Sequence, residues 1–438
     1  MPPDPVEPTP QPPPTPPPAS SPSLARRLVT GDAVVIGLGS MIGAGVFAAF
    51  APAAQAAGSG LLNGLALAAL VAYCNATSSA QLAAQYPVSG GTYVYGREQL
   101  GHWWGFLAGW GFVIGKTASC AAMALTFAAY AAPPGWERPV AIAAVVALAA
   151  VNYRGVTRTA RLTRIIVTVV LLALAVVVAS GWLGADPDLA RATPDVDTEH
   201  GWYGVLQSGG LLFFAFAGYA RIATMGEEVR DPSRTIPRAI QVALALAVGV
   251  YAVVAVTLLS VLGADGVAAT QAPVATAVAA SRWEWAVPVA RIGGAAASLG
   301  ALLALIAGIG RTAFAMGREN DLPRWLSAVH PRFNVPHRAE VALAVVVVAL
   351  VATVDLRGAI GFSSFGVLLY YLIANASAFT QATEHRMFPR ALQVLGMVLC
   401  VVLVATLPLA SVIAGAAVFA IGIVYRLVRQ RLSPSTSL

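Results

Sequence analysis

The chain has 438 residues, of which 58% are hydrophobic and only 11% are charged, and its formal net charge is +7. Soluble domains carry about 25% charged residues, so this composition excludes an ordinary soluble domain and predicts an all-α membrane protein. Arginine supplies nearly all of the positive charge, because Lys116 is the only lysine. Positive charge in the loops of a membrane protein reports orientation, and we expect no nucleic-acid partner.

The two ends of the chain differ from its apolar centre. Residues 1–23 are rich in proline, serine and threonine, which predicts a disordered cytoplasmic tail. A ligand for a proline-binding domain is the alternative interpretation of this tail. The segment 1–23 lacks the basic stretch and adjoining apolar core of a signal peptide. Residues 429–438 are predicted to form a short basic tail.

Between the tails, twelve apolar segments qualify as transmembrane helices, since a span needs about 20 residues. They lie at 31–57, 60–83, 102–131, 138–153, 160–183, 204–226, 238–263, 285–315, 338–354, 358–381, 391–408 and 410–428. Pro408 divides the last two segments, because proline breaks or kinks a helix. We therefore expect a first unit at 31–183, a second unit at 204–381, and two further helices at 391–428.

The arginines predict the orientation of these segments. With a cytoplasmic N-terminus, most arginines fall on the inner side, and the outer side keeps little more than four. Those four are Arg138, Arg191, Arg282 and Arg357. This asymmetry follows the positive-inside rule and places both termini in the cytoplasm. We expect the arginine-rich loops to contact the headgroups of membrane lipids.

Four glycines interrupt the first segment, at Gly37, Gly39, Gly43 and Gly45. A break at this depth frees backbone groups that hydrocarbon cannot satisfy, so they must face protein or a polar ligand. Free N–H groups at the start of the outer half-helix suit a carboxylate. The alternative is that the glycines only allow close packing of helices.

A second interruption lies in the sixth segment, around Gly218. This segment follows the first by five helices and therefore crosses in the opposite direction. Paired glycine breaks of this kind indicate an inverted-repeat transporter with its substrate site at the midplane. Free carbonyls near Phe214 to Ala217 suit an ammonium group, so the two breaks together predict a receptor for a zwitterion.

Five stretches of the chain follow one another in an informative order. They are Gly37–Phe47, Tyr86–Tyr95, Gly105–Trp110, Phe213–Arg238 and Gly310–Pro323. Together they resemble the amino acid–polyamine–organocation (APC) superfamily of transporters. The resemblance implies a leucine-transporter-like 5+5 inverted repeat with two extra C-terminal helices, and amino acids or related small amines as substrates. By position it implies that the carboxylate is held by Met41, Gly43, Ala44 and Gly45. It likewise implies that the amino group is held by Phe214, Ala215 and Ala217.

The sequence departs from the family pattern in its charged residues. Many proton-coupled members have a lysine in helix five, where our alignment places Val170. Lys116 instead falls in the middle of helix three, where a charge is costly and is a functional hypothesis by default. It is a candidate for proton coupling or a fixed cation, and equally for a structural lysine that donates to the carbonyls of a broken helix.

Arg221 stands close to where family members often have an acidic residue. An ion pair with Glu227 or Glu228 and a contact with an anionic substrate group both remain open for it.

Other classes of protein have little support in the sequence. Ile42 replaces the third glycine of a dinucleotide-binding motif, and we expect neither an enzyme nor a cofactor.

The sequence therefore predicts a secondary active transporter in the cytoplasmic membrane that works by alternating access. The alternative is a non-transporting amino-acid sensor of the same fold. The substrate, the oligomeric state, and the choice between proton symport, exchange and uniport stay open.

Overall fold

The computed structural model describes residues 28–43, 45–88, 90–155, 160–196 and 199–432. The regular secondary structure of these residues is helical, apart from one isolated bridge between Leu28 and Val229. The predicted tail at 1–23 and residues 433–438 of the predicted C-terminal tail lie outside this part of the chain. So does Ala44.

Apolar segments of the sequence become long helices, and two of these are broken. The α-helices are α1 (Thr30–Met41), α2 (Gly45–Ala48), α3 (Phe50–Ala57), α4 (Leu61–Gln85), α5 (Thr92–Leu100), α6 (His102–Ala131), α7 (Glu137–Tyr153), α8 (Ala160–Leu183), α9 (Gly201–Phe216), α10 (Ala220–Ala223), α11 (Pro232–Ala268), α12 (Pro273–Ala279), α13 (Val287–Arg318), α14 (His337–Thr353), α15 (Leu356–Thr380), α16 (Arg390–Thr406) and α17 (Leu409–Leu432). Within the described residues, nine helices are long and apolar enough to cross a membrane. Three more, α7, α14 and α16, have 17 residues each, which is the lower limit for a span.

The helix bounds follow those expected from the sequence closely, and Pro408 lies between α16 and α17. Three features differ from the expectation. The helices α5 and α12 were not predicted, because neither is a long apolar segment. Residues 429–432 of the predicted C-terminal tail continue α17, which ends at Leu432. Its last turn is held in place by Arg429, which donates to the Leu322 carbonyl at 3.0 Å.

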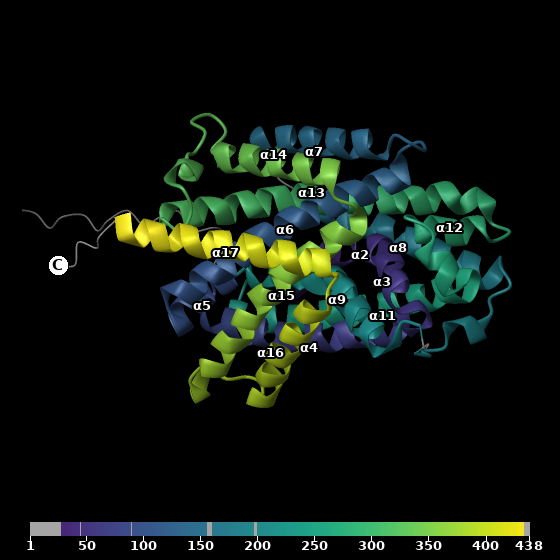
Figure 1. The fold of residues 1–438 in the computed structure, drawn as a ribbon, viewed down its shortest axis with the longest axis horizontal. Helices are drawn as coiled ribbons and strands as arrows, with labels where there is room; N and C mark the ends of the chain where they lie inside the picture. Colours follow the sequence, from purple (N-terminus) through teal and green to yellow (C-terminus); the bar gives the residue numbers. More distant parts are fainter. Residues whose placement is uncertain (1–27, 44, 89, 156–159, 197–198, 433–438) are drawn as a thin grey trace, which may run out of the picture.

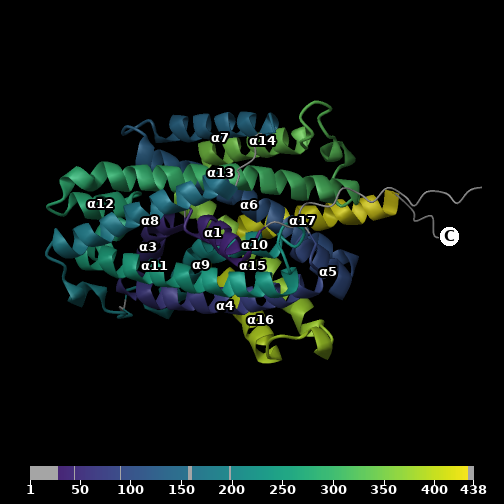
Figure 2. The same cartoon turned by 180° about the vertical axis from the view of Figure 1, so that it is seen from behind.

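The helices form one elongated bundle with the broken helices inside it. In both views α7 and α14 lie side by side along one edge, and α16 lies along the opposite edge (Figures 1 and 2). The helix α17 runs along the outside of the bundle (Figure 1) and packs mainly on α15. The segments α1 to α3 and α9 to α10 are surrounded by α4, α6, α11, α13 and α15.

Candidate functional site: two broken helices in contact

The first break follows Met41. The backbone N–H of Ile42 donates to the Leu38 carbonyl at 2.7 Å and closes α1. The chain resumes as a helix at Gly45, and the N–H of Ala49 donates back to the Gly45 carbonyl at 3.0 Å. The segments α2 and α3 therefore form one half-helix that begins at Gly45. The N–H groups of its first turn have no acceptor within the helix.

The second break is tighter than the first. The helix α9 ends at Phe216, a 3-10 turn covers Ala217–Tyr219, and α10 follows at once. The sixth segment is thus bent through a turn rather than widely unwound. This geometry still removes the last carbonyls of α9 from the regular helical pattern.

The two breaks touch each other, and glycine makes the contact possible. A Cβ atom on Gly218 would lie 2.3 Å from the carbonyl carbon of Ser40, and one on Gly45 would lie 2.5 Å from the Cα of Ala215. A Cβ on Gly43 would lie 2.8 Å from the Cβ of Ala301 on α13. Gly45 and Met41 are therefore brought against the second break, at Ala215 and Gly218, whereas Gly43 faces α13. The alternative that the glycines only allow close packing of helices also fits this contact, because Gly45 and Gly218 let one backbone approach the other.

A tyrosine from α11 ties the two breaks together. The Tyr251 hydroxyl lies 2.6 Å from the Met41 carbonyl and 2.9 Å from the Ala215 carbonyl. Tyr251 is 1% exposed, and a hydroxyl has only one hydrogen to share between these acceptors. The sequence analysis missed this residue, because a tyrosine in a long apolar helix resembles ordinary core.

Lys116 reaches the second break from α6. Its Nζ donates to the Ala217 carbonyl at 3.3 Å, and the side chain is 8% exposed. The Tyr371 hydroxyl lies 3.5 Å from the same oxygen. Two carbonyls expected to be free, those of Ala215 and Ala217, therefore already have protein donors. A carbonyl oxygen has two lone pairs, so the Ala215 carbonyl can still accept a second hydrogen bond, whereas the Ala217 carbonyl already has two donors in Lys116 and Tyr371.

Arg221 forms the ion pair that the sequence analysis raised as one option. Its Nη2 lies 3.4 Å from Oε1 of Glu228, and its Nη1 lies 3.3 Å from the Thr224 hydroxyl. The side chains of Arg221 and Glu228 are 38% and 36% exposed. Such a pair contributes at most about 1 kcal/mol to stability.

Two further predicted positions are buried. Phe214 is 8% exposed, and Val170, which was expected at the position of the family's helix-five lysine, is 3% exposed. The role of Phe214 in holding the amino group stays a prediction.

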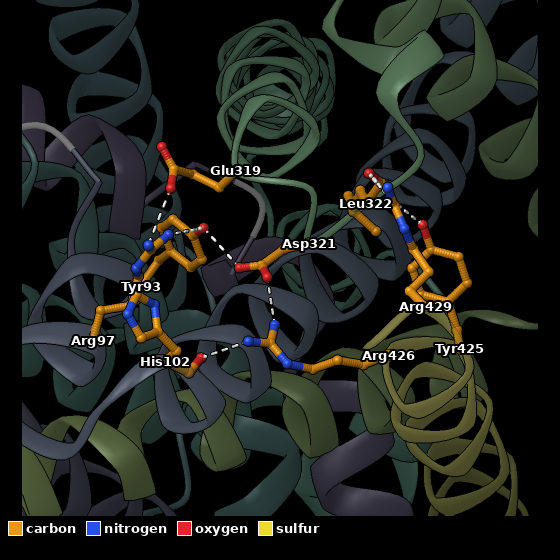
Figure 3. A network of polar contacts seen from close by, with 9 residues as sticks. All are labelled: Tyr93, Arg97, His102, Glu319, Asp321, Leu322, Tyr425, Arg426 and Arg429. Carbon is orange, nitrogen blue, oxygen red and sulfur yellow. Dashed lines mark hydrogen bonds and ion pairs between the residues drawn. The ribbon is translucent and has the colours of Figure 1, made fainter. Parts of the chain in front are cut away.

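An ionic network joins α5, the loop after α13 and α17 (Figure 3). The Tyr93 hydroxyl donates to Oδ2 of Asp321 at 2.8 Å, and Arg97 pairs with Glu319 at 3.0 Å. Arg426 pairs with the other oxygen of Asp321 and lies 4.6 Å from the ring centre of Phe106. Burial and the Asp321 carboxylate raise the pKa of Tyr93, so its hydroxyl remains a neutral donor. The network holds the last helix to the rest of the bundle.

Replacement of Arg426 by methionine should lower the stability of the protein. Arg426 and Asp321 are 10% and 9% exposed, and removal of one partner of a buried pair costs about 3–5 kcal/mol. The measurement is the melting temperature of the purified protein in detergent. Arg282→Met is the matched control, because the Arg282–Asp186 pair is 80% and 95% exposed. Equal melting temperatures for both variants would show that the buried pair is not stabilising.

Replacement of Tyr251 by phenylalanine should loosen the contact between the breaks. It removes the only side-chain donor that reaches both Met41 and Ala215 in the described part of the chain. A buried acceptor left without a partner costs about 1–3 kcal/mol. We expect a lower melting temperature and weaker substrate binding. Tyr73→Phe on the exposed side of α4 is the control, since Tyr73 is 43% exposed. Unchanged binding by Tyr251→Phe would contradict the assignment.

A bundle of apolar helices around two broken helices indicates a membrane transporter. The comparisons with known proteins agree with this class. Residues 29–435 match the amino acid permease family. The chain therefore belongs to the amino acid permease family of the APC superfamily, and it is a multi-pass membrane transporter rather than an enzyme.

Three relatives illustrate the range of the family. An uncharacterized transporter of Mycobacterium tuberculosis is 59% identical over 418 residues, which cover 94% of each chain. The branched-chain amino acid permease BcaP of Bacillus subtilis is 25% identical over 398 residues, or 86% of this chain and 85% of the relative. The chloroplastic cationic amino acid transporter 7 of Arabidopsis thaliana is 27% identical over 375 residues, or 80% of this chain and 64% of the relative.

Proposed function

We propose that this permease is a secondary active transporter that carries amino acids, or related small amines, across the cytoplasmic membrane by alternating access. The observation that carries the proposal is the direct contact of the two helix breaks, at Gly218 against Ser40 and at Gly45 against Ala215. Relatives named for branched-chain and for cationic amino acids support the amino-acid class. Because those side chains differ, the part shared by the substrates is the zwitterion.

The proposed architecture has twelve transmembrane helices in a 5+5 inverted repeat with two additional helices. Three helices of 17 residues complete the nine longer ones. Both termini would lie in the cytoplasm, because the arginine-rich loops then face the inner side.

The two poles of the substrate would bind to main chain on opposite breaks. Met41, Gly43, Ala44 and Gly45 would hold the carboxylate at the start of the outer half-helix. Phe214, Ala215 and Ala217 would hold the amino group. The Ala215 carbonyl already accepts from Tyr251, and the Ala217 carbonyl accepts from Lys116 and Tyr371. The substrate would therefore use the second lone pair of Ala215 and displace a donor from Ala217.

Lys116 would link protonation to the second break. Its ammonium donates to the Ala217 carbonyl, so loss of its proton would weaken a contact that orders the turn at Ala217–Tyr219. Lysine can give up a proton, whereas arginine does not do so in proteins. Proton coupling through Lys116 is thus the mechanism that the position supports, and exchange is the alternative mode of transport.

Binding of amino acids, and of half-molecules that carry only the amino group or only the carboxylate, tests the proposed site. The melting temperature of the purified protein would be followed with a panel of amino acids, the corresponding amines without a carboxylate, and the corresponding acids without an amino group. A ligand at about 100 times its Kd should stabilise the folded state by about 2.7 kcal/mol. We expect molecules with both groups to stabilise the protein more than either half-molecule does. Equal stabilisation by a half-molecule would contradict the zwitterion receptor.

A further inference from the structure

A long apolar groove opens between α14 and α17, away from the two broken helices. Its volume is about 830 Å³, and its walls come from α6, α13, α14, α15 and α17. On α17 it runs from Ala410 to Tyr425, which is about 22 Å at 1.5 Å per residue. The groove therefore extends through more than half of the hydrocarbon thickness of about 30 Å.

Small side chains keep the groove open. Ala339 and Ala342 line it on α14, and Ala410, Ala414 and Gly422 line it on α17. In Figure 1, α17 crosses the front of the bundle below α14, and its packing is mainly on α15. The space between α14 and α17 is thus lined by protein but not filled by a side chain from either helix.

The end of the groove at Leu322 and Tyr425 is positively charged. Arg429 donates to the Leu322 carbonyl at 3.0 Å and to the Tyr425 hydroxyl at 2.9 Å (Figure 3). Arg324 follows the lining residue Pro323 in the chain, and Arg338 precedes the lining residue Ala339. Both of these arginines are exposed.

The acidic groups near this end are already engaged or turned inward. Asp321 pairs with Arg426, and Glu319 pairs with Arg97. Glu340 is 4% exposed and lies against Gly310 on α13. Within the described part of the chain, no carboxylate pairs with the arginines at the mouth. Trp325, which is 51% exposed, adds an aromatic group of the kind found at membrane interfaces.

We propose that this groove is a binding site for one anionic phospholipid. An acyl chain would occupy the apolar channel, and the phosphate would lie at Arg324, Arg338 and Arg429. Guanidinium groups pair well with phosphate oxygens, and anionic lipids gather in the leaflet that basic segments face. The lipid would fill the space between α14 and α17 and connect the last helix to the bundle. This site is independent of the proposed transport site.

Native mass spectrometry of the full-length protein tests the proposal. The protein would be reconstituted with an equimolar mixture of phosphatidylglycerol and phosphatidylcholine, released into detergent, and analysed for retained lipid. We expect one retained phosphatidylglycerol in the unmodified protein. Ala342→Trp with Ala414→Trp should abolish this retention by filling the groove. Arg324→Gln with Arg338→Gln should weaken it about thirtyfold, because each basic residue near an anionic headgroup contributes about fivefold.

Matched variants control for general effects of the substitutions. Val345→Trp and Ile413→Trp place the same side chain on exposed positions of α14 and α17 that do not line the groove. Arg234→Gln removes an arginine that is 78% exposed and paired with Asp231. All three should retain the lipid, and every variant should keep the elution volume of the folded protein.

Three results would overturn the proposal. The first is unchanged lipid retention in the groove-filling variant with a normal elution volume. The second is equal retention of phosphatidylcholine, which would show that the arginines do not select an anion. The third is loss of a dimer, rather than of lipid, on filling the groove, which would assign the groove to a second copy of the chain.

Discussion

Substitution of Gly218 by alanine is expected to abolish amino-acid uptake. The added Cβ would lie 2.3 Å from both the carbonyl carbon and the carbonyl oxygen of Ser40, and 2.6 Å from the Met41 nitrogen. These are backbone atoms, so no side chain can rotate away, and the two breaks must separate. Overpacking of a buried contact costs about 1–3 kcal/mol. The cost falls on the contact that forms the proposed substrate site.

The measurement for Gly218→Ala is uptake in proteoliposomes together with the melting temperature of the purified variant. Gly249→Ala and Gly308→Ala are the matched controls, because a Cβ at either helical glycine would meet nothing within 4 Å. The controls should transport normally. Normal uptake by Gly218→Ala would show that the close contact between the breaks is not required for transport.

Replacement of Lys116 by methionine is expected to uncouple transport from the proton gradient. The variant loses the donor to the Ala217 carbonyl, and with it the proposed proton-dependent contact at the second break. Substrate should still exchange across the membrane but should no longer accumulate when the outer side is acidified. Lys116→Arg keeps the charge and the donor but cannot release a proton, so it should also fail to accumulate substrate.

Exchange of labelled substrate and gradient-driven accumulation would be measured for both variants in the same vesicles. Thr126→Val is the control on α6, since the buried Thr126 hydroxyl donates only to the Ala122 carbonyl of its own helix. Accumulation by Lys116→Arg would assign Lys116 as a fixed cation. Accumulation by Lys116→Met would remove Lys116 from the coupling mechanism.

The long helices and the two breaks could be predicted because their signals are local. Apolar segments of 20 residues and paired glycines are visible without knowledge of the fold. The position of Lys116 within α6 could also be predicted. Its acceptor could not, because the Ala217 carbonyl is 101 residues away in the chain.

Contacts that depend on tertiary packing were missed or misread. Arg426 falls at the end of the last predicted helix with no partner visible in the sequence, yet it is buried and paired with Asp321. A buried amide network between α4 and α15, in which Asn375 donates to Asn75 at 2.6 Å, left no pattern in the sequence. Tyr251 was indistinguishable from apolar core until its hydroxyl was located between two broken helices. In each case the partner lies in a distant segment of the chain, so no spacing along one segment could reveal it.

Uptake by purified protein in proteoliposomes tests the central claim most directly. Radiolabelled amino acids that represent small, branched, aromatic, cationic and acidic side chains would be offered with and without an inward proton gradient. Each would also be offered to vesicles preloaded with unlabelled amino acid. We predict uptake of at least one of them in either mode, and its loss in Gly218→Ala but not in Gly249→Ala. Uptake of none under any condition, by protein that still binds amino acids in the melting-temperature assay, would contradict transport and favour a sensor of the same fold.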